Sequence, residues 1–363
     1  MNPSECRKEL ETFAKQRKKE CEVAVLPDFF FDRLINLNWN HSEFSNLIGE
    51  VTKRKGGSID GIHQTDMQGG NAINVASALA NLGAKVTPIV CTSQWGLQQL
   101  RYYFRGTKVD VSHVKVLGKA SITTALEFKE GDAKTNVMIR DLGALTEFSP
   151  ENLDESDYVA IKNVDHVCLF NWAGTLKHGT ELANAVFRRT KEAGRGKTYY
   201  DTADPTPNRI AIPDLIEKIL KSELIDVLSV NENEAVVYAS LLDRDLSDKK
   251  GQLGLTELAM ESARVLAKHL HARIDLHTTA FSATLRGKTE VVAPTFKIKV
   301  LRATGAGDAW AAGNIIGDHT GLSDECRLTL ANAVAAYYLS DPEGKHPTWT
   351  ELARFLAMCD ANL

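Results

Sequence analysis

Short apolar runs alternate with segments of helical periodicity along most of the chain. The runs that predict strands are 21–26, ended by Pro27, and 84–92, 164–172, 196–203, 225–230, 273–280 and 293–300. The segments that predict helices are about 4–20, 74–83, 178–194, 231–242, 255–272, 307–317 and, as the closing helix, 323–341. This alternation is typical of an α/β fold with a mainly parallel sheet and helices on both faces. Ligands of such sheets bind outside the carboxyl ends of the strands.

Two segments interrupt the alternation. Residues 36–66 are polar and contain glycine without a clear period, and residues 119–145 read as a hairpin around Glu130, Gly131 and Asp132. We interpret both as parts of a small β-sheet lid, with lid segments at approximately 36–66 and 110–145. The whole chain, 1–363, is then a single domain that carries this lid and an N-terminal helical extension at 1–20.

Composition and charge restrict the partners. The chain has 363 residues, of which 43% are hydrophobic and 25% charged, which is ordinary for a globular protein. A net charge of -4 leaves no basic field, so we expect no nucleic-acid partner. No apolar run approaches the roughly 18 residues of a membrane helix, and the first 20 residues lack the apolar core of a secretory signal. We therefore expect no membrane partner and a cytoplasmic protein.

Cysteines and histidines give no metal-site pattern. The cysteines are scattered without a C-x-x-C pair, which favours reduced thiols in the cytosol; they are Cys6, Cys21, Cys91, Cys168, Cys326 and Cys359. His269 and His271 form the one close histidine pair. Two positions apart on a helix they face different directions, so we expect no metal ion there.

The stretch "LRATGAGDAW" (301–310) places small residues and an Asp at the start of a predicted helix. The amides of Gly305, Ala306 and Gly307 suit an anion, because the first N–H groups of a helix lack intrahelical acceptors. Asp308, whose usual pKa is about 3.9, is ionised at neutral pH and can accept a proton from a substrate hydroxyl. The alternative is a helix cap and a packing turn. A dinucleotide G-x-G-x-x-G is excluded because Trp310 stands at the third glycine position.

A second glycine-rich turn enters a helix at "QGGNAIN". Asn71 and Asn74 lie three apart, on one side of the first helical turn, and amides that both donate and accept suit a polyhydroxylated ligand. The alternative is a helix start that caps itself.

Carboxylates follow two of the predicted strands. Asp28 and Asp32 come just after the first strand and could each accept from two neighbouring hydroxyls, although Asp28 is favoured as a turn residue after Pro27. Asn231 and Glu234 follow the strand at 225–230 and offer oxygen ligands for Mg²⁺. A capped, acidic helix start is the alternative for this second pair.

These motifs stand in a characteristic order: an early Asp, G-G-N-x-x-N, N-x-x-E and a late T-G-A-G-D. From about residue 22 to the C-terminus, the ordered set resembles the ribokinase-like (PfkB) family of carbohydrate kinases. The resemblance implies a doubly wound sheet with a β lid, and ATP-dependent phosphorylation of a hydroxymethyl group. It implies Asp308 as the catalytic base and the amides of Gly305, Ala306 and Gly307 as the anion hole.

The same resemblance implies the other ligand contacts. Asn231 and Glu234 would organise Mg²⁺ and its waters. The residues implied to hold the sugar are Asp32, Gly69, Gly70, Asn71 and Asn74, with Asn136 of the lid as a further candidate. The nucleotide is implied to lie between the 278–284 turn, with Thr278, Ala280 and Ala283, and the helix that carries Asn332.

The chain departs from the family pattern at three places. The family usually reads D-T-x-G-A-G-D, but the first two positions are Arg302 and Ala303. In relatives that Asp often helps to hold potassium, so our hypothesis is that Arg302 acts as a tethered cation at the cofactor site; the alternative is that it points into solvent. Ala280 and Ala283 replace glycines of the nucleotide turn. Trp95 lies in "CTSQWG", where relatives are acidic, and we expect it in the core, with stacking on a ligand as the alternative.

The leading function is a kinase of a sugar or sugar-like alcohol, and a nucleoside kinase is the alternative within the family. A sugar-phosphate substrate would need cations, for which the candidates are Arg105, Lys134 and Arg140. A catalytically silent sensor of sugar or nucleotide is the alternative from another class, motivated by Arg302 and the missing glycines. An exposed lid edge would favour a homodimer.

Overall fold

The computed structural model describes residues 3–16, 19–130, 133–246, 253–302 and 304–358. Its main sheet has the strand order β14-β13-β12-β11-β10-β9-β1-β4. The strands are β1 (Glu22–Leu26), β4 (Lys85–Pro88), β9 (His166–Phe170), β10 (Lys197–Asp201), β11 (Val227–Val230), β12 (Arg273–His277), β13 (Phe281–Arg286) and β14 (Thr289–Pro294). The six strands from β4 to β12 are parallel, whereas β13 and β14 add an antiparallel edge. The predicted fold class is confirmed.

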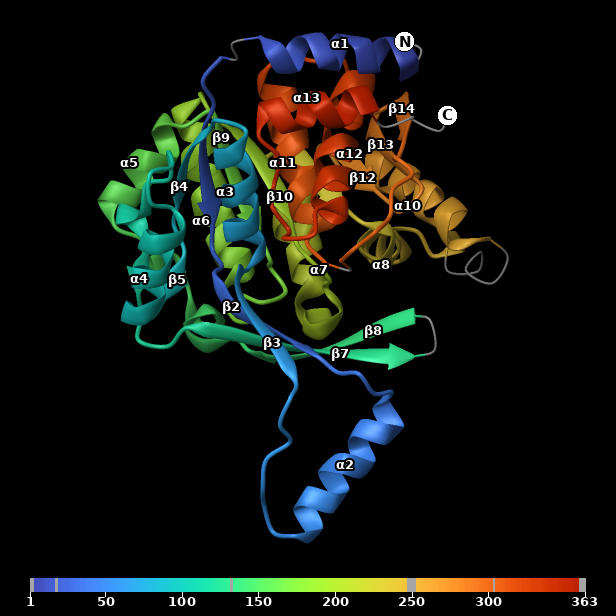
Figure 1. Cartoon of the computed structure of the whole chain (residues 1–363). Helices are drawn as coiled ribbons and strands as arrows, with labels where there is room; N and C mark the ends of the chain where they lie inside the picture. The colour runs from blue at the N-terminus through green and yellow to red at the C-terminus, as the bar shows by residue number, and fades with distance from the viewer. Residues whose placement is uncertain (1–2, 17–18, 131–132, 247–252, 303, 359–363) are drawn as a thin grey trace.

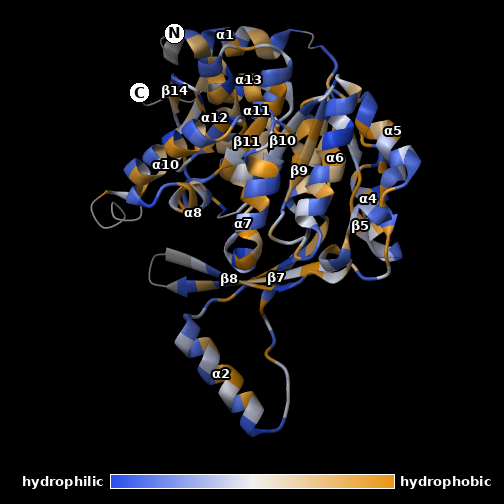
Figure 2. Ribbon diagram, turned by 180° about the vertical axis from the view of Figure 1, so that it is seen from behind, coloured by the Kyte–Doolittle hydropathy of each residue, from blue (hydrophilic) through white to orange (hydrophobic). Residues whose placement is uncertain are grey.

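Helices cover both faces of this sheet (Figure 1). The α-helices of the body are α1 (Pro3–Lys15), α3 (Asn71–Asn81), α4 (Gln94–Tyr103), α5 (Glu155–Asn163), α6 (Gly179–Ala193), α7 (Ile212–Leu215), α8 (Glu232–Leu242), α10 (Leu255–His269), α11 (Ala306–His319), α12 (Asp324–Ser340) and α13 (Trp349–Met358). Short helical turns are η1 (Val111–His113), η2 (Gly143–Glu147), η3 (Pro150–Asn152), η4 (Thr206–Ala211) and η5 (Ile216–Leu220). One apolar core joins the sheet to α6, α8 and α10, and a second joins it to α3, α11 and α12. Figure 2 shows the apolar central strands enclosed between these layers.

A second sheet forms the lid, with the order β3-β2-β7-β8. Its strands are β2 (Phe30–Asn36), β3 (His63–Gly69), β7 (Ser121–Glu130) and β8 (Ala133–Asp141). The predicted hairpin is therefore present as β7 and β8, although Gly131 and Asp132 at its tip lie outside the described residues. A separate two-stranded sheet pairs β5 (Cys91–Thr92) with β6 (Lys115–Val116), so the run 84–92 forms two short strands.

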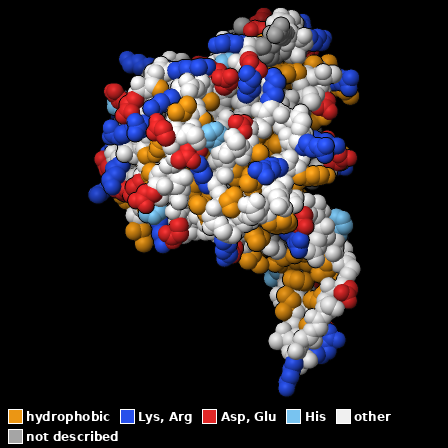
Figure 3. Space-filling model, turned by 90° about the vertical axis from the view of Figure 1, so that its left-hand side faces the viewer, with side chains coloured by type: hydrophobic (Ala, Val, Ile, Leu, Met, Phe, Trp, Pro, Cys, Tyr) orange, Lys and Arg blue, Asp and Glu red, His pale blue; other side chains and the backbone are white. Residues whose placement is uncertain are grey.

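The segment 36–66 contains a helix that we did not predict, α2 (His41–Lys53). Asn40 and Glu43 form a reciprocal cap: Asn40 Oδ1 accepts from Glu43 N at 2.9 Å, and Glu43 Oε2 accepts from Asn40 N at 3.0 Å. Phe44 contacts Phe128 of β7, with ring centroids 5.9 Å apart. Beyond this contact the helix extends away from the body as an arm (Figures 1 and 3).

Two further expectations are wrong. The strand predicted at 293–300 is displaced: residues 295–302 have no regular secondary structure. The edge strand β14 lies earlier in the chain, at Thr289–Pro294, where it pairs with β13 across the turn at Gly287. The helix at 323–341 is not the last one, since α13 follows it. The N-terminal helix packs on α13, where the rings of Phe13 and Trp349 meet edge to face at 5.6 Å.

Candidate active site

The start of α11 lies at the carboxyl edge of the sheet and is open. Gly305 is its N-cap residue, and no side-chain hydrogen bond among the described residues caps this end. Gly305 has φ +87°, and a Cβ there would lie 2.5 Å from Tyr338 Oη. Only glycine fits this left-handed, crowded position. The first amides of α11 are therefore available to an anion.

Asp308 lies in the first turn of α11 and is held by two asparagines of α3. Asn71 Nδ2 donates to Asp308 Oδ1 and Asn74 Nδ2 donates to Oδ2, each at 2.8 Å. The side chain is 8% exposed, and burial raises its pKa to about 7, although the two amides pull the other way. The ordinary pKa that we expected from the sequence is therefore wrong, because desolvation outweighs both hydrogen bonds.

Asp28 holds α3 in place. Its carboxylate is fully buried and accepts from the backbone N–H groups of Asn71 and Ala72, both at 2.9 Å, and from Asn171 Nδ2 at 2.8 Å. A carboxylate at this position also interacts favourably with the helix dipole. Its structural role after Pro27 is confirmed, and through α3 it positions the asparagines that contact Asp308.

The lid contributes Asp32, from β2, next to the glycines that precede α3. A Cβ on Gly69 would lie 2.0 Å from Asp32 Oδ2, so the close approach requires glycine. Burial raises the pKa of Asp32 to about 6. Asp32 Oδ1 and, on β8, Asn136 Oδ1 are buried and have no hydrogen-bond partner among the described residues. Buried polar atoms of this kind suit a hydroxylated ligand.

Trp95 is not in the core. It is 57% exposed and stacks on Phe31 of β2, with ring centroids 4.1 Å apart. Its place at the start of α4, on the surface beside the lid, explains why the core expectation is wrong.

Arg302 does not point into solvent. Its Nη2 donates to the carbonyl oxygen of Asp341 at 2.8 Å, and its guanidinium lies 5.1 Å from the centroid of the Tyr338 ring. A Cβ on Gly344 would lie 2.0 Å from Arg302 Nη1, so the loop after α12 approaches the guanidinium closely. The neighbouring Ala303 lies outside the described residues.

Asn231 and Glu234 form a complete helix cap at the start of α8. Asn231 Oδ1 accepts from Glu234 N at 3.0 Å, while Glu234 accepts from the backbone N–H and side-chain amide of Asn231 at 2.9 and 2.7 Å. The capped helix start is thus present. Burial, followed by the charge of Asp201, raises the pKa of Glu234 well above its usual range.

Asp201, at the end of β10, is a site candidate that the sequence analysis missed. Burial raises its pKa to about 6. Ala203, two residues on, has φ +55°, and Asn171 after β9 has φ +50°. Such non-glycine conformations cluster at functional sites. An Asp near the carboxyl end of a predicted strand was the available signal.

The predicted nucleotide residues do not all meet at this edge. Thr278 and Ala280 lie in the turn between β12 and β13, where Thr278 Oγ1 accepts from Ala280 N at 3.2 Å. Ala283 is fully buried within β13 and packs in the core, so its methyl does not face the turn. The side chain of Asn332 is used in hydrogen bonds within the protein: it accepts from Trp310 Nε1 at 2.9 Å and donates to the carbonyl oxygen of Pro294 at 2.9 Å.

His277, which we did not predict, lies beside Gly307 at the start of α11. A Cβ on Gly307 would be 3.3 Å from His277 Cε1. His277 Nε2 is buried without a partner among the described residues, and burial lowers the pKa of the ring to about 4. A neutral imidazole nitrogen therefore faces the same region as the open helix start.

Comparisons with known proteins agree with this arrangement. A profile of the pfkB family carbohydrate kinases matches residues 44–351. The chain belongs to this family. It is accordingly an ATP-dependent phosphotransferase that acts on an alcohol group, and the resemblance stated from the motifs is confirmed.

Individual relatives of this pfkB family kinase are distant. The chain is 28% identical, over 81% of its length and 88% of the relative, to an ATP-dependent ribose-1-phosphate kinase of Halopiger xanaduensis. It is 22% identical to a ribokinase of Haemophilus influenzae, over 84% and 92% of the two chains. An adenosine kinase from Sinorhizobium meliloti has the same fold with a TM-score of 0.68, at 18% identity over 93% and 98%. A ribokinase from Thermotoga maritima gives 0.68 at 16% identity over 93% and 99%.

One structural finding bears on the membrane. In the described ranges, none of the helices combines the length and the apolar character that crossing a bilayer requires.

Proposed function

We propose that this kinase transfers the γ-phosphate of ATP to a hydroxymethyl group of a sugar or sugar-like substrate, with Asp308 as the base. The observation that carries the proposal is a desolvated carboxylate, held by two amides, in the first turn of an uncapped helix. A base with a pKa of about 7 is matched to proton transfer near neutral pH.

The reaction uses two parts of the start of α11. Asp308 accepts the hydroxyl proton while the alcohol oxygen forms a bond to the γ-phosphorus and the bond from that phosphorus to the ADP oxygen breaks. The amides of Gly305, Ala306 and Gly307 stabilise the charge on the transferring phosphoryl oxygens. Because these groups lie on one rigid turn, their positioning needs no large movement.

The sugar would lie between α3 and the inner face of the lid. Asp32 and Asn136 supply acceptors without partners there, and Gly69 lets the Asp32 side chain approach the start of α3 closely. Asn71 and Asn74, whose amide nitrogens contact Asp308, offer their side-chain oxygens to substrate hydroxyls.

The carboxylates at the ends of β10 and β11 fit a magnesium ion. Burial raises the pKa of both Asp201 and Glu234, and the charge of Asp201 adds to the shift at Glu234, so a bound cation would favour the ionised carboxylates. Asn231, bonded to both oxygens of Glu234, would orient that carboxylate toward the ion or its waters. When bound, Mg²⁺ would supply positive charge that stabilises the phosphate oxygens during transfer.

The nucleotide would lie along the turn after β12, close to α11. Thr278 and Ala280 form this turn, and the carboxylate of Glu232 accepts from Thr279 N at 2.9 Å, which joins the turn to the start of α8. His277 offers an unpartnered ring nitrogen next to Gly307. These residues replace Ala283 and Asn332 as our candidates for contact with ATP.

Arg302 would act as a tethered cation in place of potassium. Its guanidinium binds a backbone carbonyl oxygen of the loop after α12, as a bound monovalent cation would, and its positive charge is permanent. We therefore expect the enzyme to be indifferent to potassium.

A phosphorylated sugar is a second candidate substrate, and Arg140 favours it. In the lid sheet, Thr123 of β7 is paired with Asp32 of β2 on one side and with Arg140 of β8 on the other. The charge of Arg140 lowers the pKa of both Asp28 and Asp32, against the effect of burial. A cation on the inner lid face suits the phosphate of a substrate such as ribose 1-phosphate, on which the Halopiger relative acts. Arg105 is exposed after α4, and the side chain of Lys134 lies outside the described part. A nucleoside remains the alternative substrate without a phosphate.

The outer lid face and the cysteines support two further proposals. Ile122, Val137 and Ile139 are exposed on the outer lid face, which supports a homodimer through the lid.

The described cysteines form no disulfide with one another, which together with the use of ATP supports a cytoplasmic location.

The test is an ATP-consumption assay with a panel of sugars, sugar phosphates and nucleosides. Turnover of at least one panel member, abolished by Asp308→Asn, supports the proposal. Binding of a panel member without any turnover by the wild-type protein would instead favour the silent sensor.

A further inference from the structure

Three potential metal ligands meet at the edge of the main sheet opposite Asp308. Cys21 precedes β1, His166 begins β9 and His319 ends α11, and one ligand atom from each lies within 4.8 Å of the other two. β1 and β9 are neighbours in the sheet, with Val23 opposite His166. His319 follows Asp308 by eleven residues, which is roughly 17 Å along a helix axis. The proposed phosphoryl transfer uses none of the three.

The cluster is buried, and its two imidazole rings contact each other. Cys21 is 2% and His166 4% exposed, and the two imidazole rings meet edge to face at 5.7 Å. No hydrogen bond joins either ring nitrogen of His166 to another described residue. A neutral imidazole keeps a lone pair on one ring nitrogen, so His166 can offer a ligand atom to a metal ion.

His319 is oriented for a ligand by the chain itself. Its Nε2 lies 3.0 Å from the carbonyl oxygen of Glu20, and in the tautomer that donates this hydrogen bond Nδ1 keeps a free lone pair. Nδ1 lies 3.9 Å from Asp165 Oδ2. Histidines that bind metals ordinarily donate their second ring N–H to a carbonyl or carboxylate in this way.

The charged groups around the cluster have both signs: Asp165 and Asp318 are negative, whereas Lys19 and Lys197 are positive. Asp318 is bound to Lys197 and Arg273 at 2.9 and 2.8 Å. Asp165 Oδ2 accepts from Glu22 N at 3.0 Å, and Asp165 Oδ1 lies 3.5 Å from Arg195 Nη2, so Asp165 would become a fourth ligand only by giving up one of these contacts.

We propose that Cys21, His166 and His319 bind a zinc ion, with Asp165 or a water molecule in the fourth position. One thiolate and two imidazoles are the donor set that Zn²⁺ prefers over Mg²⁺ or Ca²⁺. Bond lengths of about 2.3 Å to sulfur and 2.1 Å to nitrogen place tetrahedral ligand atoms roughly 3.5 Å apart. The ligand atoms lie within 4.8 Å of one another, so side-chain rotation has to shorten their separations by up to about 1.3 Å. The ion joins the beginnings of β1 and β9 to the end of α11.

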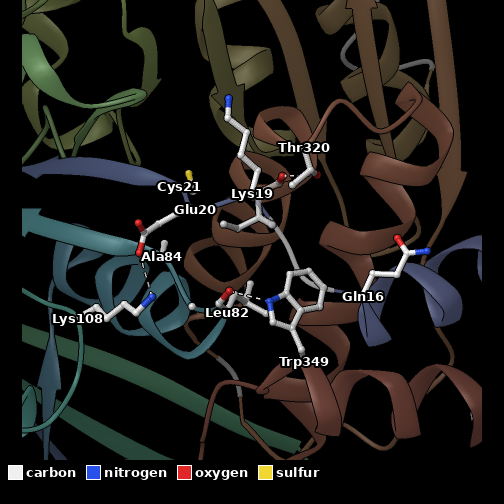
Figure 4. Close-up of a pocket in the computed structure, with 11 residues that line it drawn as sticks. Gln16, Lys19, Glu20, Cys21, Leu82, Ala84, Lys108, Thr320 and Trp349 are labelled. Atoms are coloured by element: carbon white, nitrogen blue, oxygen red, sulfur yellow. Dashed lines mark hydrogen bonds and ion pairs between the residues drawn. The ribbon is translucent and has the colours of Figure 1, made fainter.

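An entry route exists at this edge. Cys21 is among the residues that line a cavity of about 340 Å³, together with Gly83, Lys108 and Trp349 (Figure 4). The cavity lies between the end of α3, the end of α11 and the chain before β1. An ion can therefore reach the thiol without opening the sheet.

The test is metal titration of the full-length protein after treatment with a chelator. Co²⁺ serves as the spectroscopic probe, and Zn²⁺ competes with it. We expect one Co²⁺ per chain, with a thiolate-to-cobalt charge-transfer band in the near ultraviolet that Zn²⁺ removes. Cys21→Ala should abolish this band, whereas Cys91→Ala, which removes another buried thiol, should leave it unchanged. His319→Gln should weaken binding at least roughly tenfold.

Three results would overturn the site: no charge-transfer band, a band that persists in Cys21→Ala, or an affinity that His319→Gln leaves unchanged. Kinase turnover serves as the folding control, because the cluster lies far from Asp308. If Cys21→Ala does not fold, the wild-type protein decides the matter: saturating Zn²⁺ must raise its melting temperature, and must do so less in His319→Gln than in the exposed control His63→Gln.

Discussion

Asn74 donates its side-chain amide to Asp308 Oδ2 at 2.8 Å, across a sequence separation of 234 residues. This contact joins α3 to α11 at the point where the proposed proton transfer takes place. It also opposes the desolvation that raises the pKa of Asp308, because the amide stabilises the ionised carboxylate. The reactivity of the base is thus set by packing between two distant helices.

The rate should depend on pH through Asp308. The carboxylate acts only when ionised, and burial raises its pKa to about 7, so kcat/KM should be low at pH 5.5 and rise to a plateau above pH 8. A pH profile of kcat/KM under saturating ATP measures this rise, which is the acid limb of the profile. An acid limb near pH 4, the usual value for an Asp, would contradict the desolvated site.

Loss of the Asn74 amide should move the acid limb of the kcat/KM profile further toward alkaline pH. A hydrogen bond to a charged group contributes about 1.5–3 kcal/mol, so Asn74→Ala should raise the apparent pKa by roughly one to two units and reduce turnover most strongly below pH 7. Asn81→Ala removes an amide from the other end of α3, where it donates to the carbonyl oxygen of His346, and is the matched control. Identical profiles for the two variants would show that Asn74 does not tune the base.

Stability should change in the opposite sense to activity at Asp308. Its pKa is raised on folding from 3.8 to about 7, so its stabilising contribution is complete below pH 3.8 and is lost as the pH rises through 7. At pH 8 the ionised carboxylate lowers the free energy of unfolding by about 4 kcal/mol. Asp308→Asn removes this cost but weakens the hydrogen bonds from Asn71 and Asn74, which offsets about half of the gain in stability.

Asp308→Asn should therefore be more stable than the wild type at pH 8, by on the order of 2 kcal/mol, and by less at pH 5. Denaturant unfolding at the two pH values measures the difference. If the stability of Asp308→Asn relative to the wild type were lower at pH 8 than at pH 5, the carboxylate would not be desolvated as proposed.

Arg302 should make potassium unnecessary. We expect equal turnover in sodium and potassium buffers for the wild type, because the guanidinium already binds the carbonyl oxygen of Asp341. Arg302→Ala should lose at least about tenfold in kcat and recover part of it in potassium, whereas Arg105→Ala should behave as wild type. Strong potassium activation of the wild type would disprove the tethered cation.

The fold could be predicted from the sequence because its strands and helices are strongly periodic and its motifs are ordered. The arm α2 was missed although Phe44, Leu47, Ile48 and Val51 have helical spacing, because the surrounding polar residues and Gly49 obscured it. Its cap, Asn40 with Glu43, was the overlooked signal.

The site could be predicted only in part. The order of the motifs brought Asp308, Asn71 and Asn74 into one hypothesis, and the structure brings them into contact. The pKa of Asp308 could not be predicted, because it depends on burial that α3 and α11 create together. The position of Ala283 could not be predicted either, since a shift of a few residues along β13 decides between the turn and the core.

The most direct measurement of the central claim is the turnover of Asp308→Asn with ATP and the best substrate of the panel, alongside its affinity for ATP. We predict a loss of at least about 10²-fold in kcat, with ATP binding within a few fold of the wild type. Turnover close to that of the wild type would contradict Asp308 as the base.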